Sequence, residues 1–254
     1  MRPAIGVRSD YHAWVTGAVW MSTVVLSLVG VTAAVYRAAY VGDATLRAEP
    51  LRERILHTFG RTDPRLADRP DELRRFDSHF AAHPFLTLGH VIPGAVFLAF
   101  APLQFWPRLR NRHRSVHRWS GRVLMCTILV SAAPALYFGL RAPFGGGGET
   151  LAIALVATLL LTAIARAFVA IRRGQVARHR EWMLRAFALA IGIATTRVVG
   201  AVLDVALAPM GLRPATALVL NLWLGWALTV AAAELWILHT RARAVDLITA
   251  ISAA

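Results

Sequence analysis

Residues 117–122, HRWSGR, and residues 179–185, HREWMLR, are two similar basic stretches, and each one opens a hydrophobic segment. Each also follows an earlier hydrophobic segment and a short loop rich in arginine. Charged loops between hydrophobic segments set how a chain threads through a bilayer. The two stretches therefore predict two similar helical hairpins, with His117 and His179 at equivalent heights on two helices.

Working outward from these stretches, the chain contains six segments that are long and apolar enough to cross ~30 Å of hydrocarbon. It has 254 residues, of which 57% are hydrophobic. We therefore predict an all-α, polytopic membrane bundle that forms a single integral membrane domain over residues 1–254. The predicted spans are Trp14–Tyr40, Pro84–Trp106, Ser120–Leu140, Thr150–Arg172, Trp182–Leu207 and Pro214–His239.

The two similar stretches also predict how the spans are grouped. Spans two and three form one hairpin and spans four and five form another, so spans two to five form a central four-helix core. Spans one and six are added outside it. Both hairpins run in the same direction, so a duplication would be parallel rather than inverted.

Arginine predicts the orientation, because short cytoplasmic loops carry the excess of basic residues. All 28 basic residues are Arg, and the formal net charge is +14. With six spans, the basic loops and both termini fall on one side, which predicts an N-in, C-in protein of the bacterial inner membrane. The arginines concerned are Arg2, Arg8, Arg108, Arg110, Arg112, Arg114, Arg118, Arg172, Arg173, Arg178, Arg180, Arg241 and Arg243.

Arginines at the ends of the spans favour contacts with the lipid bilayer and with anionic lipid headgroups at the cytoplasmic face, rather than with nucleic acid. The single cysteine, Cys126, lies inside an apolar run, and we expect it in the core. The first outer connection, about residues 41–83, is nearly neutral, with nine Arg counted from Arg37 and eight acids. It is either a set of short amphipathic helices over the outer face or a solvated loop.

Ionisable and polar side chains at membrane depth mark candidate sites, because such residues are costly inside spans. His90, Arg197 and Asn221 fall in the outer half of spans two, five and six, with Arg197 the deepest of the three, and Asp204 lies closer to the outer surface. They predict either an anion or lipid-headgroup pocket built on Arg197, or an arginine that neighbouring helices neutralise and that holds the bundle together.

A second group lies near the cytoplasmic boundary. His117 and His179 begin diagonal helices of the four-helix core, so they could be the axial ligands of one b-type haem, with a second ring nitrogen donating to Glu234. The same pair could instead bind a divalent metal, relay protons or contact headgroups. The other members of this group are Gln104, Arg122, Arg166, Arg185, Glu234 and His239.

Several motifs between residues 83 and 200 resemble an uncharacterised bacterial membrane-protein family, domain of unknown function 2306. They are residues 83–94 (HPFLTLGHVIPG), 102–105 (PLQF), 117–122 (HRWSGR), 141–146 (RAPFGG) and 179–185 (HREWMLR). The resemblance implies a multi-span fold and brings no established activity, ligand or catalytic residue.

A fainter resemblance is to cytochrome b561-type proteins, which have six helices with haem-ligating histidines on the central four. Only His117 and His179 could correspond to such a pair, because span four has no histidine opposite His90.

Three functions stay open from the sequence. They are a redox-related protein with a haem between His117 and His179, a non-enzymatic protein that binds a headgroup or small anion near His90 and Arg197, and a proton-coupled transporter that uses Arg197, Asp204 and Glu234. No catalytic residues can be assembled at matched depths, so we do not expect an enzyme. The oligomeric state is left open.

Overall fold

The computed structural model describes residues 5–39, 41, 78–206, 210 and 212–252. They form an all-helical fold without strands in the described part. The elements are α1 (Ile5–Ala39), α4 (Pro84–Phe100), the 3-10 helix η2 (Ala101–Phe105), α5 (Pro107–Arg112), α6 (Arg114–Arg141), α7 (Gly147–Arg172), α8 (Val176–Ala206) and α9 (Pro214–Ser252).

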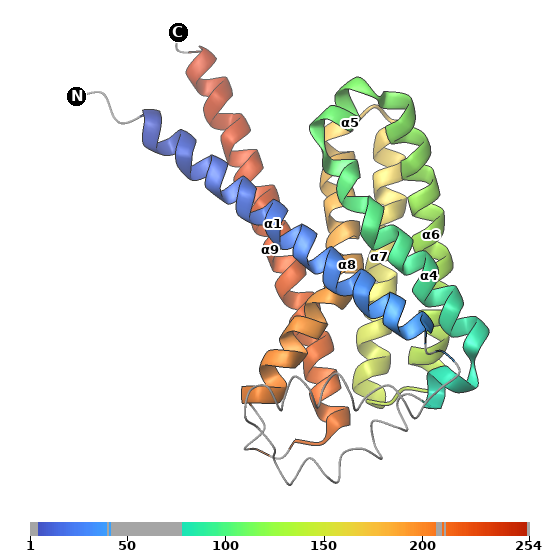
Figure 1. Ribbon diagram of the computed structural model, residues 1–254. Coiled ribbons are helices and arrows are strands. Elements are labelled where there is room, and N and C mark those ends of the chain that lie inside the picture. The colour runs from blue at the N-terminus through green and yellow to red at the C-terminus, as the bar shows by residue number, and fades with distance from the viewer. Residues whose placement is uncertain (1–4, 40, 42–77, 207–209, 211, 253–254) are drawn as a thin grey trace.

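Six of these helices contain a stretch long and apolar enough to cross a membrane, which confirms the predicted polytopic helical fold. Both termini, α5 and the connection between α7 and α8 lie at one end of the molecule, which we name the basic end (Figure 1). The turn at residues 144–146, directly before α7, lies at the opposite end, which we name the glycine-turn end. Which end faces the cytoplasm stays a prediction from the arginine counts.

Helices α6 and α8 both begin six residues before the predicted spans, at Arg114 and Val176. The difference has a physical reason: hydropathy locates only the part of a helix that lies in hydrocarbon, whereas arginine is itself a good helix former. As a result, both basic stretches belong to helices. His117 and His179 are each the fourth residue of their helix, in keeping with the similarity of the two stretches.

The ends of the helices follow local sequence signals. Pro84, Pro107 and Pro214 are each the first residue of a helix, where the missing N–H of proline has no cost. Gly146 and Gly174 have φ angles of 64° and 72°, and they sit in the turns before α7 and before α8. Glycine adopts such left-handed conformations without the steric penalty of a side chain.

The predicted grouping of spans two to five matches the packing of the helices. Neighbouring pairs are α4 with α6, α6 with α7, and α7 with α8. One core cluster then joins α4 to α8: the rings of Phe97 and Phe187 have centroids 6.3 Å apart, and those of Phe105 and Phe187 are 5.2 Å apart. A second cluster joins α7 to α8 through Leu160 and Leu189.

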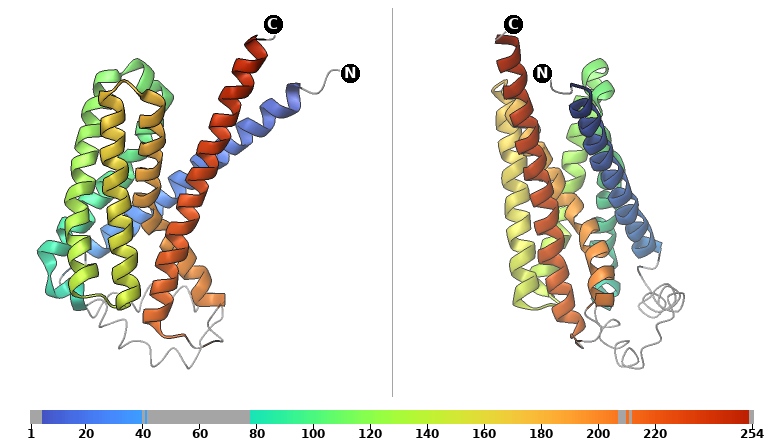
Figure 2. Two further views of the ribbon diagram at one scale, coloured as in Figure 1. Left: turned by 180° about the vertical axis from the view of Figure 1, so that it is seen from behind. Right: turned by 90° about the vertical axis from the view of Figure 1, so that its left-hand side faces the viewer.

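Helices α1 and α9 lie outside this core, as predicted. Helix α1 crosses α4 and α8 diagonally, and α9 runs along α8 and α7. The first turns of α1 and the last turns of α9 extend away from the bundle on the same side (Figure 2). Helix α8 therefore contacts α1, α7 and α9 and packs on α4, and it links the two ends of the molecule.

The contact between α8 and α9 is very close. A Cβ atom added to Gly225 would lie 2.6–2.8 Å from the backbone and methyl group of Thr196, and one added to Gly200 would lie 2.8 Å from the Nδ2 atom of Asn221. Gly192, Thr196 and Gly200 follow each other at four-residue intervals on α8. Small residues at this spacing let membrane helices approach closely.

One expectation about the core is wrong. Cys126 is exposed on α6 rather than buried. Because lipid chains are as apolar as a protein core, an apolar residue in a span can face either of them. The predicted outer connection lies almost entirely outside the described residues.

Candidate functional site

His117 and His179 both turn inward at the basic end. Every residue from Asn111 to Trp119 is exposed except His117, and every residue from Ile171 to Arg180 is exposed except His179. The two imidazoles are close enough for their charges to interact, and among charged groups His179 has the largest electrostatic effect on His117. The structure therefore brings together the pair predicted from the sequence.

The hydrogen bonds of the two rings fix their chemistry. The Nδ1 atom of His179 lies 2.9 Å from the carbonyl oxygen of Ala167, a buried residue of α7. A carbonyl only accepts, so Nδ1 carries the proton and the neutral ring keeps a lone pair on Nε2. The Nδ1 atom of His117 is buried and has no hydrogen-bond partner. Each imidazole thus has a nitrogen that a ligand could engage.

Positive charge surrounds this pair. Arg110 and Arg118 are near enough to act electrostatically on His117. Burial lowers the pKa of the Arg110 guanidinium, and the charge of Arg180 lowers it further. The basic connection before α6 and the one before α8 therefore meet beside the histidines, and an anionic group would be stabilised there.

Glu234 does not serve as a partner of either histidine, so that expectation is wrong. Its two carboxylate oxygens accept hydrogen bonds from Nε and Nη2 of Arg185, at 2.6 and 2.8 Å. Arg185 lies six residues after His179 on α8, and its planar fork fits a carboxylate through two parallel bonds. The Glu234 carboxylate, which was expected to accept a hydrogen bond from a histidine, is thus paired with Arg185.

The other predicted members of this group hold helices together. The Nε2 atom of Gln104 donates to the hydroxyl of Ser120 at 2.7 Å, which joins η2 to α6. The guanidiniums of Arg166 and Arg185 lie 5.0 and 4.7 Å from the ring centroid of Trp182. Two further contacts stay within a single helix: Arg122 stacks over Trp119, and His239 lies beside Trp236.

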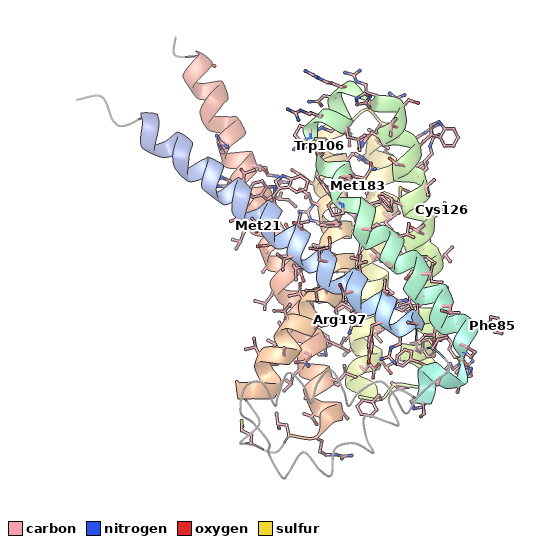
Figure 3. The ribbon with its side chains drawn as sticks, in the orientation of Figure 1. Met21, Phe85, Trp106, Cys126, Met183 and Arg197 are labelled. Carbon is pink, nitrogen blue, oxygen red and sulfur yellow. The ribbon has the colours of Figure 1, made fainter. Side chains whose placement is uncertain are left out.

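The second predicted group lies in the half of the molecule nearer the glycine-turn end. Figure 3 shows Arg197 in this half, away from Trp106 and Met183. His90 on α4 is held by Ser131 on α6: its Nδ1 atom lies 2.9 Å from the Ser131 carbonyl oxygen, and the Ser131 hydroxyl donates to the His90 carbonyl at 2.7 Å. The charges of His90 and Arg197 interact across the helices.

The structure does not join every member of this second group. Asn221 packs against Gly200 in the contact between α8 and α9, and its Oδ1 atom is buried without a hydrogen-bond partner. Among the described residues, no hydrogen bond links Asn221 to His90 or Arg197. Asp204 belongs to α8, but its side chain lies outside the described residues.

The sequence alone did not identify two side chains of this region as members of the site. Ser131 is one small polar residue in an apolar span, which is too common a pattern to single out. Arg37 ends α1 and was counted with the outer connection, yet its charge acts on Arg197. Only the crossing of α1 over α4 and α8 brings these residues together.

The described residues contain no group of three or more His, Cys, Asp or Glu side chains that could hold a metal ion. Sites for zinc alone use three or four protein ligands, whereas two imidazoles are a full axial set for haem iron. The pair His117 and His179 alone therefore falls short of the protein ligands of a zinc site.

The fold and the polar groups at two depths define a polytopic α-helical membrane protein. Residues 87–237 match the model of a family described as "Predicted membrane protein (DUF2306)", and the chain belongs to that family. The matched region includes α6, α7 and α8 in full and both histidines of the basic end. No curated protein and no solved structure matches the chain.

Proposed function

We propose that this protein binds one b-type haem at the basic end, with His117 and His179 as axial ligands, and takes part in electron transfer within the inner membrane. The observation that carries the proposal is the inward turn of these two histidines from helices that begin in the same register. Such a haem would supply one-electron chemistry.

The surrounding residues fit this group. Hydrogen bonding of Nδ1 to the Ala167 carbonyl orients the His179 ring and leaves Nε2 as the ligand atom, which is the usual arrangement of a metal-bound histidine. The buried Nδ1 atom of His117 has no hydrogen-bond partner, so its polar group is left unsatisfied. Arg110, Arg118 and Arg180 could pair with the two propionates of a haem, so the same positive charge that would repel a bare cation favours this cofactor.

The test is spectroscopic. The protein is expressed with haem supplied, purified in detergent, and its haem content is measured from the Soret band and a pyridine haemochrome assay. We expect about one haem per chain, as a single pair of axial histidines allows. His117→Ala and His179→Ala should each lose most of it. His113→Ala is the matched control, because His113 is exposed one turn before His117.

A wild-type protein without a Soret band would refute the proposal, and so would equal haem content in all three variants. Circular dichroism and size-exclusion chromatography establish that each variant is folded. A loss of haem in a folded His179→Ala protein then reports the lost ligand.

The other two functions considered from the sequence depend on Arg197 instead. For a proton-coupled transporter, Arg197 and Glu234 would have to act together. Glu234 is held by Arg185 nearer the basic end, and no described contact connects it with Arg197. Anion or headgroup binding needs only Arg197 and its neighbours, and it is compatible with a haem at the other end.

A further inference from the structure

Arg197 is an exposed charged side chain on the apolar, membrane-spanning stretch of α8. It lies six residues before Leu203, where the apolar stretch of α8 ends, and at a rise of 1.5 Å per residue this is about 9 Å along the helix. Its exposed neighbours on α8 are Val198 and Val202. No hydrogen bond or ion pair joins Arg197 to another residue of the described chain. An unpaired guanidinium at this depth is costly unless an anion accompanies it.

The helices around Arg197 form a junction that opens toward the glycine-turn end. At Gly30 of α1, an added Cβ atom would lie 2.5 Å from Leu98 of α4 and 3.4 Å from Ala194 of α8, so the three helices meet there. Arg37, His90 and Arg197 all lie beyond this meeting point in the same direction, one to three helical turns away. Each of the three helices contributes one basic side chain.

These basic groups act on one another. The charge of Arg37 affects Arg197, and the charge of Arg197 affects His90. His90 donates its Nδ1 proton to the Ser131 carbonyl, so a second proton would reside on Nε2 and make it a donor. The guanidinium of Arg197 and a protonated His90 would together offer several N–H donors to one oxyanion.

We infer that the junction of α1, α4 and α8 binds a phosphate group, with Arg197 as the main ligand and His90 as a second donor when protonated. The phosphate belongs either to a lipid headgroup that enters between the helices from the bilayer or to free phosphate. This inference is independent of the haem, which would lie near the basic end.

Binding is coupled to proton uptake. A phosphate near His90 stabilises the protonated ring, and the protonated ring strengthens phosphate binding by the same factor. The other charged groups that act on this ring are Arg197 on α8 and, through it, Arg37 on α1, and Ser131 on α6 fixes the ring. Among these groups none is acidic, so protonation adds attraction for an anion only.

The experiment measures the thermal stabilisation of the full chain, purified in a maltoside detergent, by two probes. One probe is dioleoyl phosphatidylglycerol and the other is inorganic phosphate, against chloride at equal ionic strength. We expect at least one probe to raise the wild-type melting temperature by several degrees. Arg197→Gln should remove most of that rise, whereas Arg141→Gln, an exposed arginine at the glycine-turn end, should keep it.

Each outcome is decisive. A response to the lipid alone assigns the site to a headgroup, and a response to inorganic phosphate alone assigns it to the free ion. No response to either probe overturns the inference, as does an equal response of the wild type and Arg197→Gln. If Arg197→Gln does not fold, Arg197→Lys is the second variant, because it keeps the charge but loses the two parallel N–H donors of the guanidinium. Its apparent Kd for the active probe should rise several-fold.

The proton coupling is measured with the same probe at a high and a low pH, the low one being the most acidic at which the chain stays folded. The wild type should bind more tightly at the lower pH by several-fold. His90→Gln should lose that difference while it keeps the response at the higher pH. A wild-type affinity without pH dependence would remove His90 from the site and leave Arg197 in it.

Discussion

His179 and His90 are held in the same way, yet their surroundings differ. Each donates its Nδ1 proton to a backbone carbonyl of a neighbouring helix, at 2.9 Å in both cases. His179 acts electrostatically on a second imidazole, His117, whereas the charged group that acts on His90 is the guanidinium of Arg197. The same anchored ring is thus part of the proposed haem site at one end and of the proposed phosphate site at the other.

In both regions the neighbouring side chain, rather than the histidine itself, determines which kind of ligand the site suits. A neutral ring with a free lone pair suits iron, and a second imidazole completes the axial pair. An imidazole beside an arginine is a poor site for a cation, because the guanidinium repels it. Once the ring is protonated, it offers a second N–H donor to an anion. Helix α8 supplies both His179 and Arg197, so changes in this helix test both regions together.

The largest effect is expected where α8 meets α9, because a change there disturbs both regions. A Cβ atom at Gly225 would lie 2.6–2.8 Å from Thr196, so Gly225→Val must push the two helices apart. Overpacking of this kind costs roughly 1–3 kcal/mol. The melting temperature should fall by several degrees, together with haem content and the phosphate response. Gly17→Val is the control, since a Cβ atom at Gly17 meets nothing within 4 Å.

The next effect separates the regions. His179→Ala should lose haem and keep the phosphate response, and Arg197→Gln should do the reverse. Because distant sites behave additively, the double variant should show both losses and no extra one. The two readouts are taken on the same preparations. A loss of haem in Arg197→Gln of more than a small fraction would mean that the regions are coupled through α8.

The sequence predicted the membrane class and the helices well, because length, hydropathy and arginine placement are local properties. It also predicted that His117 and His179 occupy the same position in two helices, since two similar stretches begin both helices, and their role as a haem pair stays a prediction. It placed the helix starts at Arg114 and Val176 too late. Hydropathy reports the depth of a residue, and it does not report where a backbone first becomes helical.

What the sequence could not predict depends on which way a side chain faces. In a membrane protein the lipid and the core are equally apolar, so nothing in the run around Cys126 distinguishes an exposed position from a buried one. Glu234 was paired with a histidine because of its depth, but Arg185 reaches it. Ser131 and Arg37 join the second region only through the crossing of helices that are far apart in the chain.

A smaller effect concerns the basic end alone. Glu234→Gln should weaken the two hydrogen bonds from Arg185 and loosen α9 near the proposed haem site. Glu181→Gln is the matched control, because Glu181 accepts an equally bidentate pair from Arg241, whose side chain is 55% exposed. Exposed pairs contribute about 0–1 kcal/mol. We expect a larger fall in melting temperature for Glu234→Gln, and equal falls would show that the Arg185 pair is no more than a surface contact.

The smallest effect concerns the anchor of His90. Ser131→Ala removes the hydroxyl that donates to the His90 carbonyl at 2.7 Å but keeps the Ser131 carbonyl that accepts the ring proton. A lost hydrogen bond of this kind costs about 1 kcal/mol. Stability should fall slightly, and haem content should not change. Because the carbonyl still fixes Nδ1 as the donor, the pH dependence of phosphate stabilisation should persist. If it disappeared in a folded Ser131→Ala protein, the hydroxyl rather than the carbonyl would orient the ring, and the match between His90 and His179 would fail.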